Sequence, residues 1–214
     1  MFLNTHTHFK TDSEFPEIIN LTFKEAKAVY NSDQEGLFSV GIHPWEVDEI
    51  TNENFNELVN WSSDKRFVFV GECGLDKFSK ASFEKQKYMF EQQVFLSEKI
   101  EKPLIIHCVG YFNELFKIKQ QLKPQQLWVI HGFRGKPQLA QQVLKNGCAI
   151  SFGEHFNVDS VAITPFNKLF VETDESKVKI EEIYNELALI KLCTVEELNA
   201  GNQLLQLILN HNRL

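Results

Sequence analysis

Phe67-Val68-Phe69-Val70-Gly71-Glu72 is a run of aromatic and β-branched residues that ends in a carboxylate. A continuous apolar run of this kind is typical of a strand buried on both faces, as in a parallel sheet covered by helices. Similar runs recur along the chain and are mostly separated by segments with helical periodicity. Because this alternation is the signature of an α/β fold, the sequence predicts a parallel sheet with helices packed against it.

Eight of these runs are predicted to be strands. They are Phe2–His6, Glu17–Leu21, Leu37–Ile42, Phe67–Gly71, Pro103–His107, Leu127–His131, Ala149–Phe152 and Leu169–Glu172. Eight parallel strands that alternate with helices form a TIM-type (β/α)8 barrel. The 214 residues are at the short end for this fold, so we expect one domain over residues 1–214. The first β-to-β connection, through Phe9–Pro16, is too short for a helix, which predicts a compact barrel trimmed at this point.

Helical periodicity is clearest in the second half of the predicted fold. It marks Ser82–Ile100, Phe112–Leu122 and Lys136–Asn146, and two further helices, Val178–Lys191 and Thr194–Leu209, are expected near the end of the chain. Thr194 and Glu197 have the spacing of a capping box, which predicts where the last helix begins.

Composition and charge favour a cytoplasmic protein without membrane partners. The 22 Lys and Arg residues against 29 Asp and Glu residues give a net charge of −7, so no global basic field attracts long nucleic acids. The four cysteines, Cys73, Cys108, Cys148 and Cys193, form no CxxC pair, which favours reduced thiols. No signal-peptide pattern and no apolar run of membrane-spanning length is present. The sequence leaves the oligomeric partner open.

Ionisable residues follow the apolar runs at their ends. Five of the eight runs end in a histidine or a carboxylate, and the residues concerned are His6, His8, Glu72, His107, His131 and Asp174. In a (β/α)8 barrel the C-terminal ends of all strands meet at one mouth, where the active site lies. We therefore predict that these six residues lie close together and bind metal.

Each residue also has an ordinary structural explanation. His6 and His8 lie on one face of a strand, where they could be hydrogen-bonded polar residues instead of a ligand pair. Glu72 could be a salt-bridged residue at a strand end, and Asp174 could be a helix N-cap. Either His107 or His131 could be a core histidine that is hydrogen-bonded to the backbone. A metal site explains the recurrence at five strand ends better than five unrelated structural needs.

The motifs in this order resemble the TatD metal-dependent hydrolases, a family of TIM-barrel deoxyribonucleases. The blocks that carry the resemblance are Thr5-His6-Thr7-His8, Val40-Gly41-Ile42-His43-Pro44, Val70-Gly71-Glu72-Cys73-Gly74-Leu75-Asp76, Pro103-Leu104-Ile105-Ile106-His107, His131-Gly132-Phe133-Arg134-Gly135 and Leu169-Phe170-Val171-Glu172-Thr173-Asp174. The resemblance implies that His6, His8, Glu72 and Asp174 hold one metal and that Glu72 bridges to a second metal held by His107 and His131. Asn4 and Val109 depart from the family pattern, which has Asp and Arg at these positions.

Two divalent ions at this mouth would support hydrolysis. The histidine-rich ligand set suits Zn²⁺ or Mn²⁺, and Mg²⁺ is compatible with it. A pair of such ions about 3.5–4 Å apart activates water and stabilises an in-line displacement. We expect Asp174 to act as the general base and Glu72 to take part in catalysis. Asp76 is a candidate for orienting a ligand.

The expected activity is that of a TatD-type phosphodiesterase or 3′-exonuclease, with DNA ends or nucleotides as substrate. Arg134 is the best candidate for a phosphate contact, because a guanidinium binds two oxygens at once, although it could be a solvated loop charge. His43 is a candidate substrate contact and could equally have a structural role. The alternatives are hydrolysis of a C–N or ester bond in a small molecule, and a metal-stabilised binding protein without turnover.

Overall fold

The structure is a computed structural model that describes residues 2–11 and 14–200. The eight strands of its sheet follow one another in chain order, which is the order of the TIM-type (β/α)8 barrel that the sequence predicts. The strands are β1 Asn4–Thr7, β2 Glu17–Asn20, β3 Leu37–Val40, β4 Phe67–Asp76, β5 Leu104–Val109, β6 Trp128–Ile130, β7 Ala149–Phe152 and β8 Leu169–Val171. The helices are α1 Phe23–Tyr30, α2 Asn52–Ser62, α3 Phe83–Ile100, α4 Phe112–Leu122, α5 Pro137–Lys145, α6 Val158–Ile163, the 3-10 turn η1 Phe166–Lys168, α7 Ile180–Lys191 and α8 Val195–Ala200.

The chain divides into two compact units. The first unit consists of the residues up to Ile19 together with those from Val129 on, and the second unit is Asn20–Trp128. The organisation of residues 1–214 as a single domain stays a prediction.

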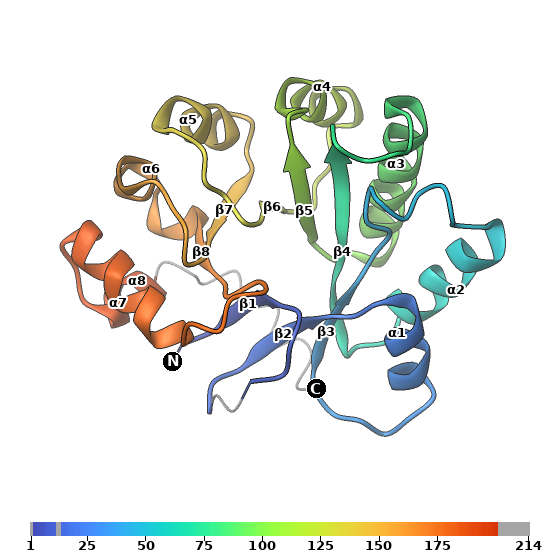
Figure 1. Cartoon of the computed structure of the whole chain (residues 1–214), viewed down its shortest axis with the longest axis horizontal. Coiled ribbons are helices and arrows are strands. Elements are labelled where there is room, and N and C mark those ends of the chain that lie inside the picture. The colour runs from blue at the N-terminus through green and yellow to red at the C-terminus, as the bar shows by residue number, and fades with distance from the viewer. Residues whose placement is uncertain (1, 12–13, 201–214) are drawn as a thin grey trace. The chain divides into compact units, whose positions relative to one another are not determined.

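In the first unit, β1 lies beside the end of β8. The strands β6, β7 and β8 pair in parallel, and β1 pairs with β2. A bridge between Thr7 and Asp174 joins β1 to the residues that follow β8. The helices α5, α6 and α7 follow one another along β7 and β8 (Figure 1). This pairing brings His6 in β1 and His8 directly after it next to Asp174.

In the second unit, β4 is the central strand and is buried along its whole length between β3 and β5. The prediction that this strand ends at Gly71 is wrong, because it continues to Asp76. Gly74 has a φ of +140°, and a Cβ at this position would overlap the carbonyl oxygen of His107. The glycine therefore permits the close approach of β4 to β5, and Glu72 lies inside a strand, not at its end.

Aromatic side chains fill the core of each unit. In the second unit the rings of Phe90 and Trp128 are 5.1 Å apart. In the first unit the rings of Phe133 and Phe152 are 6.0 Å apart. These four side chains are buried, and burial of each large apolar side chain contributes about 1.5–3 kcal/mol to folding.

The expected helices are present, and three helices were not expected from periodicity. The additional helices are α1, α2 and α6. The capping box at the start of α8 is confirmed: Glu197 N–H donates to Thr194 Oγ1 at 3.1 Å, and Thr194 N–H donates to Glu197 Oε2 at 2.8 Å. The part of the predicted last helix after Ala200 lies outside the described residues. The described part of the β1–β2 connection contains no helix, as expected. None of the helices in the described ranges is long and apolar enough to cross a lipid bilayer.

Candidate functional site

The first cluster consists of His6, His8 and Asp174 in the first unit. His8 Nε2 lies 3.4 Å and His6 Nε2 lies 3.8 Å from the same carboxylate oxygen, Asp174 Oδ1. His6 is fully buried in β1, whereas His8 and Asp174 are partly exposed. Two neighbouring ligand atoms bound to one cation at about 2.0–2.1 Å are about 2.8–3.4 Å apart in octahedral or tetrahedral geometry. The three donor atoms lie within 4.8 Å of one another, so they could hold one divalent ion.

The backbone of Asp174 is held in an uncommon conformation by β1. Its φ is +55°, in the left-handed region that few residues other than glycine adopt. Asp174 N–H donates to the His6 carbonyl at 3.0 Å, and His8 N–H donates to the Asp174 carbonyl at 3.2 Å. These bonds fix the carboxylate beside the two histidines. Asp174 is not a helix N-cap, because the N-cap of α7 is Lys179.

Asn4 reinforces this junction between β1 and the residues after β8. Its Nδ2 donates to Thr173 Oγ1 at 2.7 Å, and its Oδ1 accepts from Thr173 N–H at 3.0 Å. Asn4 is buried, and Thr173 directly precedes Asp174. The amide thus orients the end of the strand that carries the carboxylate.

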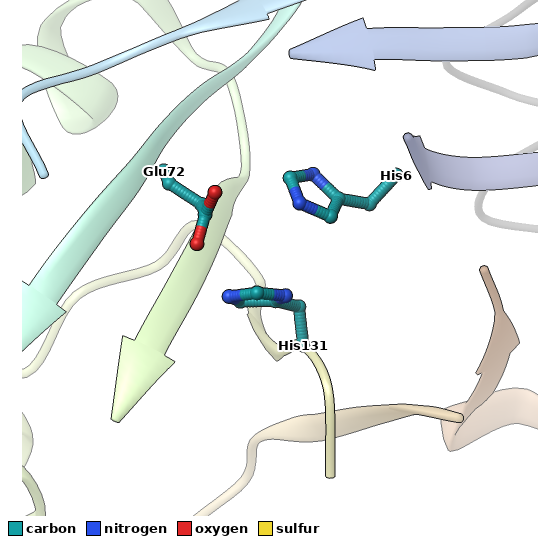
Figure 2. A group of neighbouring side chains, drawn as sticks. All are labelled: His6, Glu72 and His131. Atoms are coloured by element: carbon teal, nitrogen blue, oxygen red, sulfur yellow. The ribbon is translucent and has the colours of Figure 1, made fainter. Parts of the chain in front are cut away.

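His131 and Glu172 form a second group of donors in the first unit. The rings of His6 and His131 lie side by side with centroids 4.6 Å apart; Figure 2 also draws Glu72, which belongs to the other unit. Glu172 Oε1 lies 3.6 Å from His131 Nδ1 and accepts a hydrogen bond from Gly132 N–H. Glu172 Oε2 is buried and has no hydrogen-bond partner among the described residues. Because leaving a buried carboxylate oxygen without a partner is costly, a cation is a fitting neighbour for it.

The second cluster consists of His43, Glu72 and His107 in the second unit. Glu72 Oε1 lies 3.4 Å from His107 Nδ1 and 3.8 Å from His43 Nε2. The imidazole centroids of His43 and His107 are 4.5 Å apart. Asn20 holds Glu72 in place, since its Oδ1 accepts from Glu72 N–H at 3.0 Å and its Nδ2 donates to Glu72 Oε2 at 3.4 Å.

Asp76 orients His107 from the opposite edge of the imidazole ring. His107 Nε2 lies 2.9 Å from Asp76 Oδ2. This is the arrangement in which a carboxylate fixes the tautomer and orientation of a metal-binding histidine. Burial raises the pKa of Asp76, but hydrogen bonds from Phe78 N–H, His107 and Trp45 outweigh it and leave the pKa below its ordinary value.

A hydrogen bond from the Trp45 backbone determines which nitrogen of His43 accepts and which faces Glu72. Trp45 N–H donates to His43 Nδ1 at 3.2 Å. Nδ1 is therefore an acceptor, and a neutral His43 carries its proton on Nε2, the atom that faces Glu72. His43 also offers a ring nitrogen to the group that it forms with Glu72 and His107, so the geometry is compatible with a hydrogen-bond donor and with a ligand.

The donor sets of both units fit divalent metal ions. Within each of three groups, every member offers a ligand atom within 4.8 Å of the others: His6, His8 and Asp174; His131, Glu172 and Asp174; and His43, Glu72 and His107. Imidazole nitrogens with carboxylate oxygens suit Zn²⁺ and Mn²⁺, and carboxylates also suit Mg²⁺.

Arg134 lies in the loop after β6 and is exposed. Among residues 2–11 and 14–200, no hydrogen bond or ion pair of its guanidinium is present. Its assignment as a phosphate contact stays a prediction, as does the alternative of a solvated loop charge.

Sequence reasoning missed Glu172 and Asn20 as site residues. Glu172 ends the apolar run of β8 as Glu72 follows that of β4, but it was assigned to the strand. Asn20 is the last residue of β2. The other candidates were identified as polar residues at the ends of apolar runs. Both Asn20 and Glu172 lie at such ends, so the same criterion applied to every strand would have found them.

Comparisons with known proteins agree on one family. The sequence profile described as TatD related DNase matches residues 5–201. A Buchnera aphidicola protein named "Uncharacterized metal-dependent hydrolase" is 29% identical over 147 residues, which are 64% of this chain and 55% of that protein. A Vairimorpha ceranae protein named "Putative deoxyribonuclease TATDN1 homolog" is 29% identical over 201 residues, which are 81% of this chain and 72% of that protein. The chain thus spans about half the length of the first of these relatives.

A solved structure shares the fold. The crystal structure of YJJV, a TatD homologue from Escherichia coli, superimposes with a TM-score of 0.78 over 94% of each chain at 21% sequence identity.

Proposed function

Because the chain belongs to the TatD-related DNase family, we propose that it is a metal-dependent phosphodiesterase that acts on DNA ends as a 3′-exonuclease. The observation that carries the proposal is the first cluster, in which two imidazole nitrogens lie 3.4 and 3.8 Å from one oxygen of Asp174. The name of the Vairimorpha ceranae relative supports the substrate class.

The proposed cofactors are two divalent ions, Zn²⁺, Mn²⁺ or Mg²⁺. One would be held by His6, His8 and Asp174, and the other by Glu72 and His107. The roles that the family resemblance implies, Glu72 as a bridging carboxylate and His131 as a ligand of the second ion, are part of the proposal. When bound, such ions supply Lewis-acid activation of water and neutralise the charge of a phosphodiester.

The protein's own side chains would transfer the proton and bind the substrate. The partly exposed Asp174 carboxylate would accept the proton of the attacking water. His43 would donate a hydrogen bond to the substrate through Nε2. Arg134 would bind two phosphate oxygens of the substrate. The backbone bonds that hold Asp174 against β1 would keep the proton acceptor in a fixed position.

The decisive experiment combines metal analysis with a substrate panel. The purified chain, loaded with Mn²⁺ or Zn²⁺, is tested on single-stranded oligonucleotides with free and blocked 3′ ends, and on amides, lactones and carboxylic esters. We expect release of mononucleotides from free 3′ ends only. Turnover of a neutral ester or amide without turnover of DNA would favour the small-molecule alternative, and bound metal without any turnover would favour a binding protein.

Variants test the ligand assignment. His8→Ala and His107→Ala should each lose about one metal ion per chain and most of the turnover, because each removes a ligand from a different cluster. His155→Ala is the matched control, since His155 is exposed and lies in none of the three donor groups. Full metal content in both cluster variants would contradict the assignment.

A further inference from the structure

Two strongly exposed aromatic side chains flank the carboxylate that orients His107. Trp45 is 61% exposed and Phe78 is 72% exposed, whereas the other two tryptophans, Trp61 and Trp128, are buried. Trp45 Nε1 donates to Asp76 Oδ2 at 2.8 Å, and Phe78 N–H donates to Asp76 Oδ1 at 2.8 Å. Both aromatic residues are thus tied to a residue in direct contact with the second cluster.

The loops that carry these rings are held together. Ser79 Oγ donates to the Pro44 carbonyl at 2.7 Å, which links the loop after β4 to the loop after β3. The indole of Trp45 also meets the His43 ring edge to face, with centroids 5.3 Å apart. Its nitrogen edge is fixed while most of its surface is open to solvent, so little conformational entropy would be lost when a flat ligand packs on it.

A cation lies beside the aromatic pair. Lys77 Nζ is 4.8 Å from the centroid of the Phe78 ring. Gly110 has a φ of +77°, and a Cβ at that position would overlap the aliphatic part of the Lys77 side chain. Lys77 N–H donates to the Val109 carbonyl at 2.9 Å, so the residue is anchored at the end of β5. The absence of a side chain at Gly110 leaves room for the lysine stem.

We propose that Trp45, Phe78 and Lys77 form a nucleotide subsite of the active site. A nucleobase stacks on the exposed aromatic faces, and Lys77 Nζ contacts a phosphate of the same strand. This inference rests on the proposed function and narrows its substrate to single-stranded ends, because stacking on a protein ring requires an unpaired base. Stacking would supply affinity that the net charge of −7 cannot supply by diffuse attraction.

Binding can be measured without turnover. The full chain is kept in chelator and titrated with a short oligothymidylate and with an abasic oligomer that carries the same number of phosphates. Because Trp45 is the exposed tryptophan of the three, a base that stacks on it should quench the intrinsic fluorescence. We expect quenching by the oligothymidylate, and about tenfold or more weaker binding of the abasic oligomer.

Variants are compared by the anisotropy of a labelled oligothymidylate. Trp45→Leu and Phe78→Ala should each weaken binding about tenfold, and Trp45→Phe should recover part of the loss. Lys77→Met should reduce the salt dependence of binding by about one phosphate contact. The matched controls are Tyr88→Leu, at an aromatic side chain that is 62% exposed on α3, and Lys80→Met, at an exposed lysine; both should bind normally. Phe78→Ala removes only a surface ring, so it remains informative if Trp45→Leu disturbs Asp76.

The outcomes separate this inference from the proposed function. Normal binding by both aromatic variants, or equal binding of the abasic oligomer, overturns the stacking subsite even if the enzyme hydrolyses DNA. Base-dependent binding that the variants weaken supports the subsite, even if no divalent ion restores hydrolysis. Absence of hydrolysis with every divalent ion would overturn only the proposed function. Capture of another protein by this surface, without base-dependent quenching, also overturns the subsite.

Discussion

At the scale of single residues, Asp174 is the side chain whose backbone and chemistry are most closely linked. The left-handed region costs a residue other than glycine about 1–3 kcal/mol, and the conformation persists only where the surrounding structure imposes it. Here two backbone hydrogen bonds to the segment His6–His8 impose it. The conformation turns the carboxylate toward the two imidazoles, so the energy spent on the backbone serves the geometry of the first cluster.

Asp174→Asn tests the proposed proton acceptor with little disturbance of the fold. Asparagine tolerates the left-handed region as well as aspartate does, so the variant should fold normally. Turnover should fall by about 10²–10⁴ because the amide cannot accept the proton of the attacking water. The measurement is kcat on a single-stranded oligonucleotide at matched metal content, with the exposed neighbour Glu175→Gln as control. Near-normal kcat in Asp174→Asn would remove the residue from catalysis.

The sequence identified residues that the structure groups within each unit. His6, His8 and Asp174 form one group, and Glu72 and His107 belong to another. They could be found because each follows an apolar run of a parallel strand, although Glu72 and His107 lie within β4 and β5 and not at the ends where the sequence placed them. The supporting partners could not be found in the same way: Asn20 touches Glu72 only through a contact between residues far apart in sequence.

At the scale of elements, β4 shows why strand ends are hard to predict. The glycine at position 71 after an apolar run predicts the end of a strand, yet the strand continues to Asp76. Its glycines are required by the close approach to β5, which no local pattern reveals. The helices α1 and α2 were missed, although capping boxes at Thr22 and Thr51 mark their starts. Short helices carry few periodic positions, and their caps then become the stronger signal.

Arg66, which is paired with Asp64, links the turn between α2 and β4 to the segment after α1. Arg66 Nη2 donates to Asp64 Oδ2 at 2.7 Å, and Arg66 Nη1 donates to the Ser32 and Gln34 carbonyls at 2.8 and 3.1 Å. The hydrogen bond from Arg66 holds the pKa of Asp64 below its ordinary value. Because both side chains are less than one fifth exposed, the pair should contribute to stability in a pH-dependent way.

Asp64→Asn should reveal this contribution. A lowered carboxylate pKa stabilises the fold above the unfolded-state pKa, about 3.9, and the contribution is lost as the pH falls through the lower folded-state pKa. A loss of about 1 kcal/mol should lower the melting temperature by about 2–4 °C at neutral pH. We expect the difference in melting temperature between wild type and Asp64→Asn to close at strongly acidic pH. A difference that is constant with pH would show that the ionised carboxylate is not responsible.

At the scale of the whole molecule, the proposed metal binding should be linked to the stability of the fold. The chain carries a net charge of −7, and the donor groups of both units place carboxylates near one another or near imidazoles. Without divalent ions, no bound positive charge would offset the repulsion between these carboxylates. Chelation is therefore expected to affect the stability of the fold as well as the activity.

The melting temperature should differ with and without chelator if the two clusters bind ions. An ion that binds only the folded state adds RT ln(1 + [L]/Kd), about 2.7 kcal/mol at a hundredfold excess over Kd. For a chain of this size, about 1 kcal/mol corresponds to about 2–4 °C, so each occupied site should raise the melting temperature by about 5–10 °C. EDTA should remove this increment from the wild type. His8→Ala should retain the part that depends on the second cluster, and His107→Ala the part that depends on the first. An identical melting temperature of the wild type with and without EDTA, together with no metal by elemental analysis, would contradict both proposed ion sites.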